Sequence, residues 1–398
     1  MKVIICGAGI AGLALAERLH TLGAAVVVVE KAPGPRTQGY MIDFFGPGYD
    51  AAEAMGVLPR IRELGHHVEE MTYRDRHGRR RAGMRFARFA KIVDGRLISI
   101  MRPDLERALR DHVPAGVEIR HATTVTGIDN RADGVTVTLT GGTTIDADLL
   151  VGADGIHSTV RDQTFGPERR FLRYLGFHTA AYSFDDAGVH AQVAGQFCLT
   201  DTVDRQMGFY GLRGERVAVF TVHRTADPSL PADPRAAIRR EYGTLGWVAP
   251  RALAACPPPE HVYYDQVAQI DMPAWTRDRV TLIGDAAHAV SLLAGQGASL
   301  GITGAYVLAE HLSHAKTIET ALDGYERTLR PVVTDKQQVA RNGTRWFIPA
   351  TTTQLHIRRA ALKLARVPVI DRYVAAALAG KSTGIIDRPL GPASPATT

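Results

Sequence analysis

Residues 281–297 read TLIGDAAHAVSLLAGQG, and this stretch decides the fold. The apolar run 280–283 predicts a strand that ends at Gly284-Asp285, after which small residues begin a helix. A second turn, Gly295-Gln296-Gly297-Ala298, opens another helical stretch. Turns of this kind present bare backbone N–H groups, which bind phosphate oxygens or the edge of an electron-rich ring. The carboxylate of Asp285 is placed where it can accept hydrogen bonds from sugar hydroxyls.

A second loop of the same type lies at the N-terminus, in Gly7-Ala8-Gly9-Ile10-Ala11-Gly12. It follows an apolar run and precedes a helical pattern and a second apolar run that ends at Glu30-Lys31. This strand–loop–helix–strand context is what the dinucleotide fingerprint requires, and it favours dinucleotide binding over a glycine-rich turn without a ligand. An acid at Glu30, rather than an arginine, predicts a ribose without a 2′-phosphate.

Composition sets the class and the compartment. The chain has 398 residues, of which 45% are hydrophobic, so it can bury two domain cores. The net charge is +6, and the basic run 74–81 lacks aromatic residues, which favours a solvated hairpin over a nucleic-acid site. Three widely spaced cysteines suggest neither a metal site nor a disulfide framework, as expected of a cytoplasmic protein. No run approaches transmembrane length.

The order of predicted elements places nucleotide-type segments on both sides of a β-rich insertion. Residues 166–270 show period two, typical of an antiparallel sheet, interrupted by one helix at Pro234–Gly243. From Gly297 the chain is mostly helical, with breaks near 347–353 and at Pro368. We therefore expect an α/β fold: a Rossmann-type nucleotide domain with an inserted antiparallel β-sheet substrate domain and C-terminal helices. The predicted division is a nucleotide domain in three parts (1–73, 96–165 and 271–325), a β-segment at the substrate domain (74–95), the substrate domain (166–270), the C-terminal helices (326–390) and a disordered tail (391–398).

A third motif, Ala153-Asp154-Gly155-Ile156-His157-Ser158-Thr159-Val160-Arg161, directly follows a predicted strand. Asp154-Gly155 makes the turn, and Ser158 is placed to cap the next helix. Arg161 lies in the first turn of that helix, where a cation opposes the helix dipole, so an anionic partner is expected nearby. The alternative is an ordinary capped helix with a solvent-facing arginine.

The three motifs, in this order and with a β-insertion between the last two, resemble the class A flavoprotein monooxygenases. This is the p-hydroxybenzoate hydroxylase-like family, which includes aromatic polyketide hydroxylases and tetracycline-inactivating monooxygenases. The resemblance covers roughly the whole chain and implies non-covalently bound FAD, with NAD(P)H as a transient co-substrate that has no domain of its own. The chain departs from the family at Leu292, Ser299 and Gly304-Ala305, where Pro, Asn and Asp-Ala are frequent.

The resemblance also implies roles for individual residues. The FAD pyrophosphate would lie on the N-terminal loop, and the adenosine ribose would be held at the end of the following strand; the residues concerned are Gly7, Gly9, Ile10, Ala11, Gly12, Glu30 and Lys31. Arg102 matches an arginine near the pyrophosphate and the ribityl chain, and an arginine at a helix N-terminus also requires a nearby anion. Asp154 and Arg161 belong to the motif linked to both FAD and NAD(P)H. The ribityl chain and the isoalloxazine ring would contact Gly284, Asp285, Gly295, Gln296, Gly297 and Ala298.

The implied reaction is NAD(P)H- and O2-dependent hydroxylation, or Baeyer–Villiger oxidation, of an aromatic or polyketide-like molecule through a flavin hydroperoxide. Because the cofactor carries this chemistry, no side chain is assigned as catalytic and no metal is expected. His288 is interpreted as a loop or helix-start residue. Candidate pocket residues are Tyr182, Phe209, Tyr210 and Phe220, with sheet core as the alternative, and Asp43, with a structural hydrogen bond as the alternative. We expect a monomer or homodimer without nucleic-acid partners or stable membrane association.

Two other functions remain open. The first is a flavin-dependent halogenase or reductase on the same fold, although Trp346-Phe347-Ile348-Pro349 only partly matches the halogenase signature of two tryptophans before Ile-Pro. The second is a non-catalytic membrane-associated protein, supported only by the basic amphipathic stretch 356–366, which a packing helix explains better.

Overall fold

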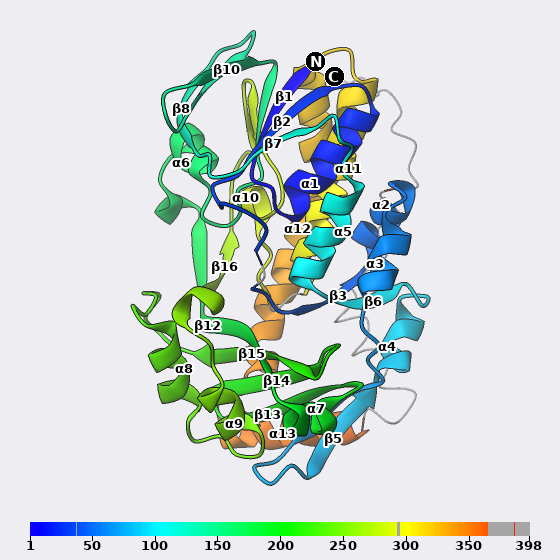
Figure 1. The fold of residues 1–398 in the computed structure, drawn as a ribbon, viewed down its shortest axis with the longest axis vertical. Helices are drawn as coiled ribbons and strands as arrows, with labels where there is room; N and C mark the ends of the chain where they lie inside the picture. Colours follow the sequence, from blue (N-terminus) through cyan, green and yellow to red (C-terminus); the bar gives the residue numbers. More distant parts are fainter. Residues whose placement is uncertain (37, 293–294, 365–385, 387–398) are drawn as a thin grey trace, which may run out of the picture.

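The computed structural model describes residues 1–36, 38–292, 295–364 and 386. The half drawn uppermost in Figure 1 contains a six-stranded sheet in the order β17-β18-β11-β1-β2-β7. All its pairs are parallel except the β17–β18 hairpin. The central strands are continuous apolar runs because both faces of the sheet are covered. The strands are β1 (Lys2–Cys6), β2 (Ala25–Val29), β7 (Glu118–Arg120), β11 (Leu149–Gly152), β17 (Thr276–Arg277) and β18 (Val280–Leu282).

Helices and two small sheets complete this half. The helices that contact one another beside the sheet are α1 (Ile10–Thr21), α5 (Arg102–His112) and α11 (Gly297–His314), with α2 (Pro47–Ala54) and α3 (Leu58–Leu64) outside them. A three-stranded antiparallel sheet is formed by β8 (Val125–Asn130), β9 (Val135–Leu139) and β10 (Thr144–Ala147). Strands β3 (Met41–Phe45) and β6 (Leu97–Met101) pair antiparallel. The short helices α6 (Thr159–Phe165) and α10 (Asp285–His288) follow β11 and β18.

The other half is a seven-stranded sheet in the order β16-β12-β15-β14-β13-β4-β5. One face is covered by α7 (Ala187–Val193), α8 (Pro234–Tyr242) and α9 (Ala249–Ala254), and the opposite face is directed at the nucleotide half. The 3-10 turns η1 (Glu168–Arg170) and η2 (Pro259–His261) precede the strands β12 and β16, respectively. The strands are β4 (Glu70–Arg74), β5 (Arg80–Arg85), β12 (Leu172–Asp185), β13 (Gln196–Thr202), β14 (Arg205–Gly211), β15 (Arg216–Arg224) and β16 (Tyr263–Ile270).

Of the two helices near the C-terminus, the first connects the halves and the second packs on the seven-stranded sheet. Helix α12 (Ile318–Phe347) begins beside α11 and ends at the seven-stranded sheet, where Ile348 packs against Phe177, Val222 and Val267. Helix α13 (Thr352–Leu364) packs against β5. Within the basic stretch 356–366, Arg358 and Arg359 turn inward and pair with Asp201 of β13. The described part of that stretch is therefore a packing helix, which is the alternative that the sequence favours.

The fold class predicted from the sequence is confirmed, and so is the break in the C-terminal helices near residues 347–353. The hairpin predicted for residues 74–81 is the β4–β5 turn. The expected break at Pro368 and the expected tail lie outside the described residues. None of the helices that the structure describes is both long and apolar enough to cross a bilayer.

Some local features of the fold are not evident from the sequence pattern. Residues 49–65 form two helices, because the chain turns at Gly56, which has φ +77°. Strand β8 and the helices α7 and α9 were missed, as was α4 (Phe86–Ile92), because runs of six or seven residues give too few turns for a periodic signal. The insertion sheet is not wholly antiparallel, since β13 pairs parallel with β4. Strand β4 also crosses the predicted domain boundary at residue 73.

The N-terminal loop and the loop at Gly284 lie next to each other because their backbones pack closely. Gly284 has φ +59°, and a Cβ there would lie 2.9 Å from the Cβ of Ala11 in α1. A Cβ on Gly301 of α11 would lie 3.4 Å from the same methyl group. Small residues at these positions therefore let α1, α11 and the turn before α10 come together, although more than 270 residues separate the two loops in the sequence.

This junction predicts the effect of one added methyl group. Gly284→Ala should lower the free energy of unfolding by about 2–4 kcal/mol, because it combines positive-φ strain with a close contact in a packed region. Gly23→Ala is the matched control: Gly23 has φ +87°, but nothing lies within 4 Å of its added Cβ. Urea denaturation of both variants separates the cost of positive-φ strain from the cost of the close contact. Equal losses of stability in the two variants would contradict the proposed close contact.

Candidate cofactor and substrate site

The three glycines of the N-terminal loop are required for different reasons. Gly7 has φ +110°, and a Cβ there would lie 2.5 Å from the carbonyl oxygen of Ala153. A Cβ on Gly12 would overlap the carbonyl oxygen of Gly7. Gly9 has an ordinary φ of −83°, and nothing lies within 4 Å of its added Cβ. Packing thus explains two of the glycines, whereas the third borders open space at the N-terminus of α1, as phosphate binding requires.

Glu30 ends β2 beside this loop. Its carboxylate accepts hydrogen bonds from the backbone N–H of Ala8 and of Ala32, both at 2.8 Å. A carboxylate can accept about four hydrogen bonds, so capacity remains for ribose hydroxyls. Contact with the ribose stays a prediction, as does a role for the exposed Lys31.

Asp285 lies at the first position of α10, after the turn at Gly284. A Cβ on Gly297 would lie 3.5 Å from Oδ1 of Asp285, so the carboxylate is beside the N-terminus of α11. Its surroundings raise the pKa by desolvation, and the charge of Arg102 partly offsets this effect. Among the described residues none donates a hydrogen bond to this carboxylate, which leaves its oxygens available to sugar-type hydroxyls.

Arg102 begins α5 and faces the same region. Its backbone N–H donates to the carbonyl of Tyr40 at 2.9 Å, and its guanidinium donates to Glu106 at 3.3 Å. The pKa of Tyr40 is raised, mainly by burial, while Arg102 opposes the rise and Asp285 adds to it. The charges of Arg102 and Asp285 therefore act on each other near the turn before α10, and contact of either residue with FAD stays a prediction.

The middle motif serves the start of α6. The carboxylate of Asp154 accepts hydrogen bonds from Ser158 Oγ at 2.5 Å and from the backbone N–H of Thr159 at 2.7 Å and Val160 at 3.1 Å. Ser158 Oγ in turn accepts from the backbone N–H of Arg161, so the predicted cap is confirmed. The Asp154 carboxylate is thus directed at the helix and also interacts with the thiol of Cys6, while the Asp154 backbone lies next to Gly7.

Arg161 is completely buried, so the solvent-facing alternative was wrong. Its guanidinium donates to the carbonyl oxygens of Ala286 at 3.0 Å and Ile156 at 2.6 Å, and it pairs with Glu168 at 3.0 Å. Glu168 is the anionic partner that the sequence required but did not identify. Arg161 therefore joins the middle motif to α10, and its direct contact with NAD(P)H stays a prediction.

The candidate pocket residues divide between the two faces of the seven-stranded sheet. Tyr182 and Phe209 lie in the core between the sheet and α7–α9, so the pocket interpretation is wrong for them and the core alternative holds. Tyr210 and Phe220 lie on the face that meets the nucleotide half. Alternation along a strand predicts two faces but cannot say which one meets the cofactor.

Aromatic residues that the sequence did not single out complete this face. The ring of Tyr40 lies 5.6 Å from that of Tyr263 and 6.3 Å from that of Phe220. Phe197 stacks on Tyr210 with ring centroids 4.1 Å apart. We call Tyr40, Phe220 and Tyr263 the aromatic wall.

Asp43 lies beside this face, on β3. It accepts a hydrogen bond from Ser99 Oγ at 2.6 Å, so the predicted structural alternative is present. Burial raises the pKa of Asp43 to about 6, and the hydrogen bond from Ser99 opposes that rise. The charge of Asp43 also helps to raise the pKa of Tyr210, behind the larger effect of burial.

The loop before α11 has the geometry expected of a ring-side turn. Gly295 has φ +64°, and Gln296 precedes the first residue of the helix. Ser299, where the resembling family often has Asn, accepts a hydrogen bond from the backbone N–H of Gly48 at 2.9 Å. Residues 293–294 lie outside the described residues, so the contacts of this loop with a flavin ring stay predictions.

His288 is buried against Trp275, with ring centroids 4.9 Å apart, and burial lowers its pKa to about 4. No group of three or more potential metal-binding side chains occurs among the residues that the structure describes. The Ile-Pro pair of the partial halogenase signature lies where α12 ends, and Ile348 there packs into the core.

Comparisons with known proteins agree with this geometry. A family model described as an FAD binding domain matches residues 1–340, and the chain belongs to this family. An uncharacterised protein of Mycobacterium tuberculosis is 32% identical over 320 residues, covering 79% of this chain and 85% of the relative. A flavin-dependent monooxygenase of Legionella longbeachae is 27% identical over 344 residues, covering 85% and 87% of the two chains.

Two solved structures are similar over nearly the whole chain. The tetracycline destructase Tet(51) has a TM-score of 0.78 at 25% identity, covering 93% of this chain and 97% of its own. HpxO of Klebsiella pneumoniae, solved with FAD and uric acid, has a TM-score of 0.79 at 24% identity and coverage of 98% of both chains. The predicted FAD cofactor and the predicted resemblance to class A flavoprotein monooxygenases are confirmed.

The open space at Gly9 predicts a variant that folds without its cofactor. Gly9→Val should keep its secondary structure but lose most bound FAD, because the side chain would occupy the pyrophosphate position. Gly12→Ala is the contrasting variant, and it should be destabilised even without FAD, because its Cβ meets Gly7. Flavin absorbance per protein and circular dichroism measure both effects. A folded Gly9→Val protein with full flavin content would exclude this loop as the FAD site.

The raised pKa of Asp43 predicts a pH-dependent stability difference. The folded state binds more protons than the unfolded state between about pH 4 and 6, so Asp43 costs stability as the pH rises through this window. Asp43→Asn keeps an acceptor for Ser99 and removes the charge. The variant should equal the parent below pH 4 and exceed it by about 1–3 kcal/mol above pH 7. Thermal denaturation from pH 4 to 8 measures this, and a difference independent of pH would contradict the assignment.

Proposed function

We propose that this FAD-dependent monooxygenase takes electrons from NAD(P)H and uses O2 to hydroxylate, or oxidise in the Baeyer–Villiger sense, an aromatic or polyketide-like molecule. One observation carries the proposal: the place where both nucleotide loops meet, marked by Arg102 and Asp285, also borders an aromatic-rich sheet face. The charges of Arg102 and Asp285 act on Tyr40 and on Tyr263 of the aromatic wall. A flavin ring held by the loops would therefore face a substrate held by the sheet.

Each part of the cofactor has a suitable partner. The loop at Gly9 offers backbone N–H groups and open space to the pyrophosphate, and Glu30 offers a fixed carboxylate to the ribose. Asp285 offers an acceptor to the ribityl hydroxyls, and Arg102 offers a cation nearby. When bound, FAD accepts a hydride and activates oxygen, which is chemistry that no protein side chain supplies. The protein's own contribution is to position the two reactants and to exclude water.

The aromatic wall and the relatives support the proposed substrate class. Flat rings pack well on tyrosine and phenylalanine in offset or edge-to-face geometry, and such contacts add about 0.5–1.5 kcal/mol each beyond area burial. Tet(51) is named for tetracycline, and HpxO was solved with uric acid. Tetracycline and uric acid are both ring compounds. These relatives support a ring substrate here without identifying it.

Transfer of one oxygen atom from O2 into the product is the test. A panel of phenols, fused-ring polyketides and purines is screened for compounds that stimulate NAD(P)H oxidation, and each hit is turned over under 18O2. Mass spectrometry should show one labelled oxygen in the product. Label found only in peroxide or water across the panel would contradict oxygenation and favour an oxidase or reductase. Chlorinated product from chloride-containing reactions would favour the halogenase.

A further inference from the structure

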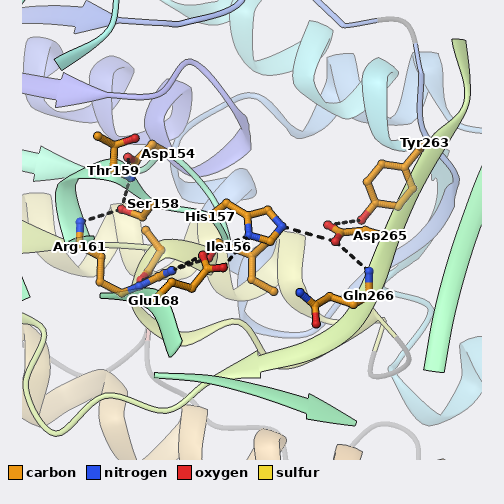
Figure 2. A network of polar contacts seen from close by, with 11 residues as sticks. Asp154, Ile156, His157, Ser158, Thr159, Arg161, Glu168, Tyr263, Asp265 and Gln266 are labelled. Atoms are coloured by element: carbon orange, nitrogen blue, oxygen red, sulfur yellow. Dashed lines mark hydrogen bonds and ion pairs between the residues drawn. The ribbon is translucent and has the colours of Figure 1, made fainter. Parts of the chain in front are cut away.

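A histidine of the middle motif connects the two halves beside the proposed site. His157 lies in the loop between β11 and α6, and Figure 2 shows its ring between Glu168 and Asp265. Nδ1 lies 3.1 Å from both carboxylate oxygens of Glu168, and Nε2 lies 3.4 Å from Oδ1 of Asp265. Asp265 comes from β16 of the seven-stranded sheet, so the contact crosses from one half to the other.

This geometry requires a particular charge on His157. A neutral imidazole has one N–H donor and one acceptor, whereas a carboxylate only accepts hydrogen bonds. A ring with a carboxylate at each nitrogen is satisfied only as an imidazolium, which donates from both. The side chain of His157 is 42% exposed, so it can exchange its proton with solvent.

Each carboxylate also has a partner that leads toward the site. Glu168 pairs with the buried Arg161, which donates to the carbonyl of Ala286 next to Asp285. Asp265 accepts a hydrogen bond from the hydroxyl of Tyr263 at 3.4 Å. The ring of Tyr263 in turn packs on Tyr40 in the aromatic wall. The imidazolium of His157 thus lies between two groups of contacts. On one side, Glu168 and Arg161 lead to α10, which carries Asp285. On the other side, Asp265 holds Tyr263 of the aromatic wall.

We propose that His157, as an imidazolium, is a positioning residue that holds Asp265 and thereby fixes Tyr263 and the aromatic wall against the substrate ring. That the aromatic wall contacts a substrate ring rests on the proposed function. The link between His157 and Asp265 is independent of that function. When His157 is neutral, one of its two carboxylates loses its donor, and the Asp265 end, which has the longer contact, is released first.

The direction of the pH dependence follows from the groups around His157. Its pKa is raised by the hydrogen bond and charge of Asp265 and by those of Glu168, against a lowering by burial. The other charged group packed there, Arg161, faces Glu168 rather than the imidazole. A histidine with a raised pKa keeps its contacts fully below about pH 6.5 and loses them as the pH rises through the raised value.

The link itself is tested without any substrate. Histidine NMR on the holoenzyme follows ring titration, and the His157 signal is identified by its absence in His157→Gln. We expect a pKa above 6.5 in the parent and a fall of about one unit in Asp265→Asn, because an opposite charge at this distance favours the imidazolium. His67, an exposed histidine 3.9 Å from Glu69, is the control residue for substitution. An unchanged His157 titration in Asp265→Asn would overturn the proposal.

The positioning role is tested with a ring substrate found in the oxygenation screen. His157→Gln keeps one donor but carries no charge, and it should raise KM about tenfold at pH 6.5 with a smaller change in kcat. The KM of the parent should rise toward that of the variant at high pH, so the difference disappears there. His67→Gln is the matched control and should behave as the parent. A ratio of the KM of His157→Gln to the KM of the parent that equals one at pH 6.5, or that does not change with pH, would overturn the positioning role. If no substrate is oxidised, the oxygenase function fails while the NMR titration still decides the link.

Discussion

The close approach of α1, α11 and the turn before α10 is the constraint on which the site depends. Ala11, Gly284 and Gly301 have almost no side chain, so three backbone segments from opposite ends of the chain can come together. This contact places the open N-terminus of α1 and the carboxylate of Asp285 in one region. Neither loop could bind a dinucleotide cofactor in this way if a larger side chain held them apart. The same packing directs β18 into the parallel sheet next to β11 and so leaves the insertion outside.

The middle motif supports this junction from within. Asp154 and Ser158 satisfy the N–H groups at the start of α6, which would otherwise be unpaired in a buried position. Arg161 is then held beneath the motif, where its charge is compensated by Glu168 and by two backbone carbonyls. Removing Glu168 would leave the buried Arg161 charge with backbone carbonyls as its only described partners, which is unfavourable. The motif therefore shapes the loop at Gly7 and fixes the position of α10.

The sequence predicts the features of this site that depend on short-range geometry. Glycines at tight turns, an acid at the end of a strand and a serine at a helix start each determine local backbone structure, and the structure has them where expected. The sequence does not indicate which face of the seven-stranded sheet meets the nucleotide half. Tyr182 and Tyr210 both lie in alternating strands, and only packing against α7–α9 or against β3 separates them. Glu168 was missed because no motif marks the turn after α6 that carries it, although Arg161 is only 7 residues away. Asp265 was missed because its partner, His157, is 108 residues away in the sequence.

Two carboxylates near the proposed site lie in the field of a cation, and under the proposed function this arrangement restricts the substrate. Asp285 is opposed by Arg102, and Asp265 by His157, so two carboxylates near the aromatic wall have nearby cations from the nucleotide half. Paired charges in partly desolvated surroundings attract a charged ligand less strongly than a single unpaired charge would. The contacts left to the ligand are then mainly the ring faces of the wall and the hydroxyl groups of its tyrosines. Under the proposed function, such a surface would favour an uncharged ring compound with a few polar substituents over a small carboxylate-bearing molecule, which would need an arginine of its own.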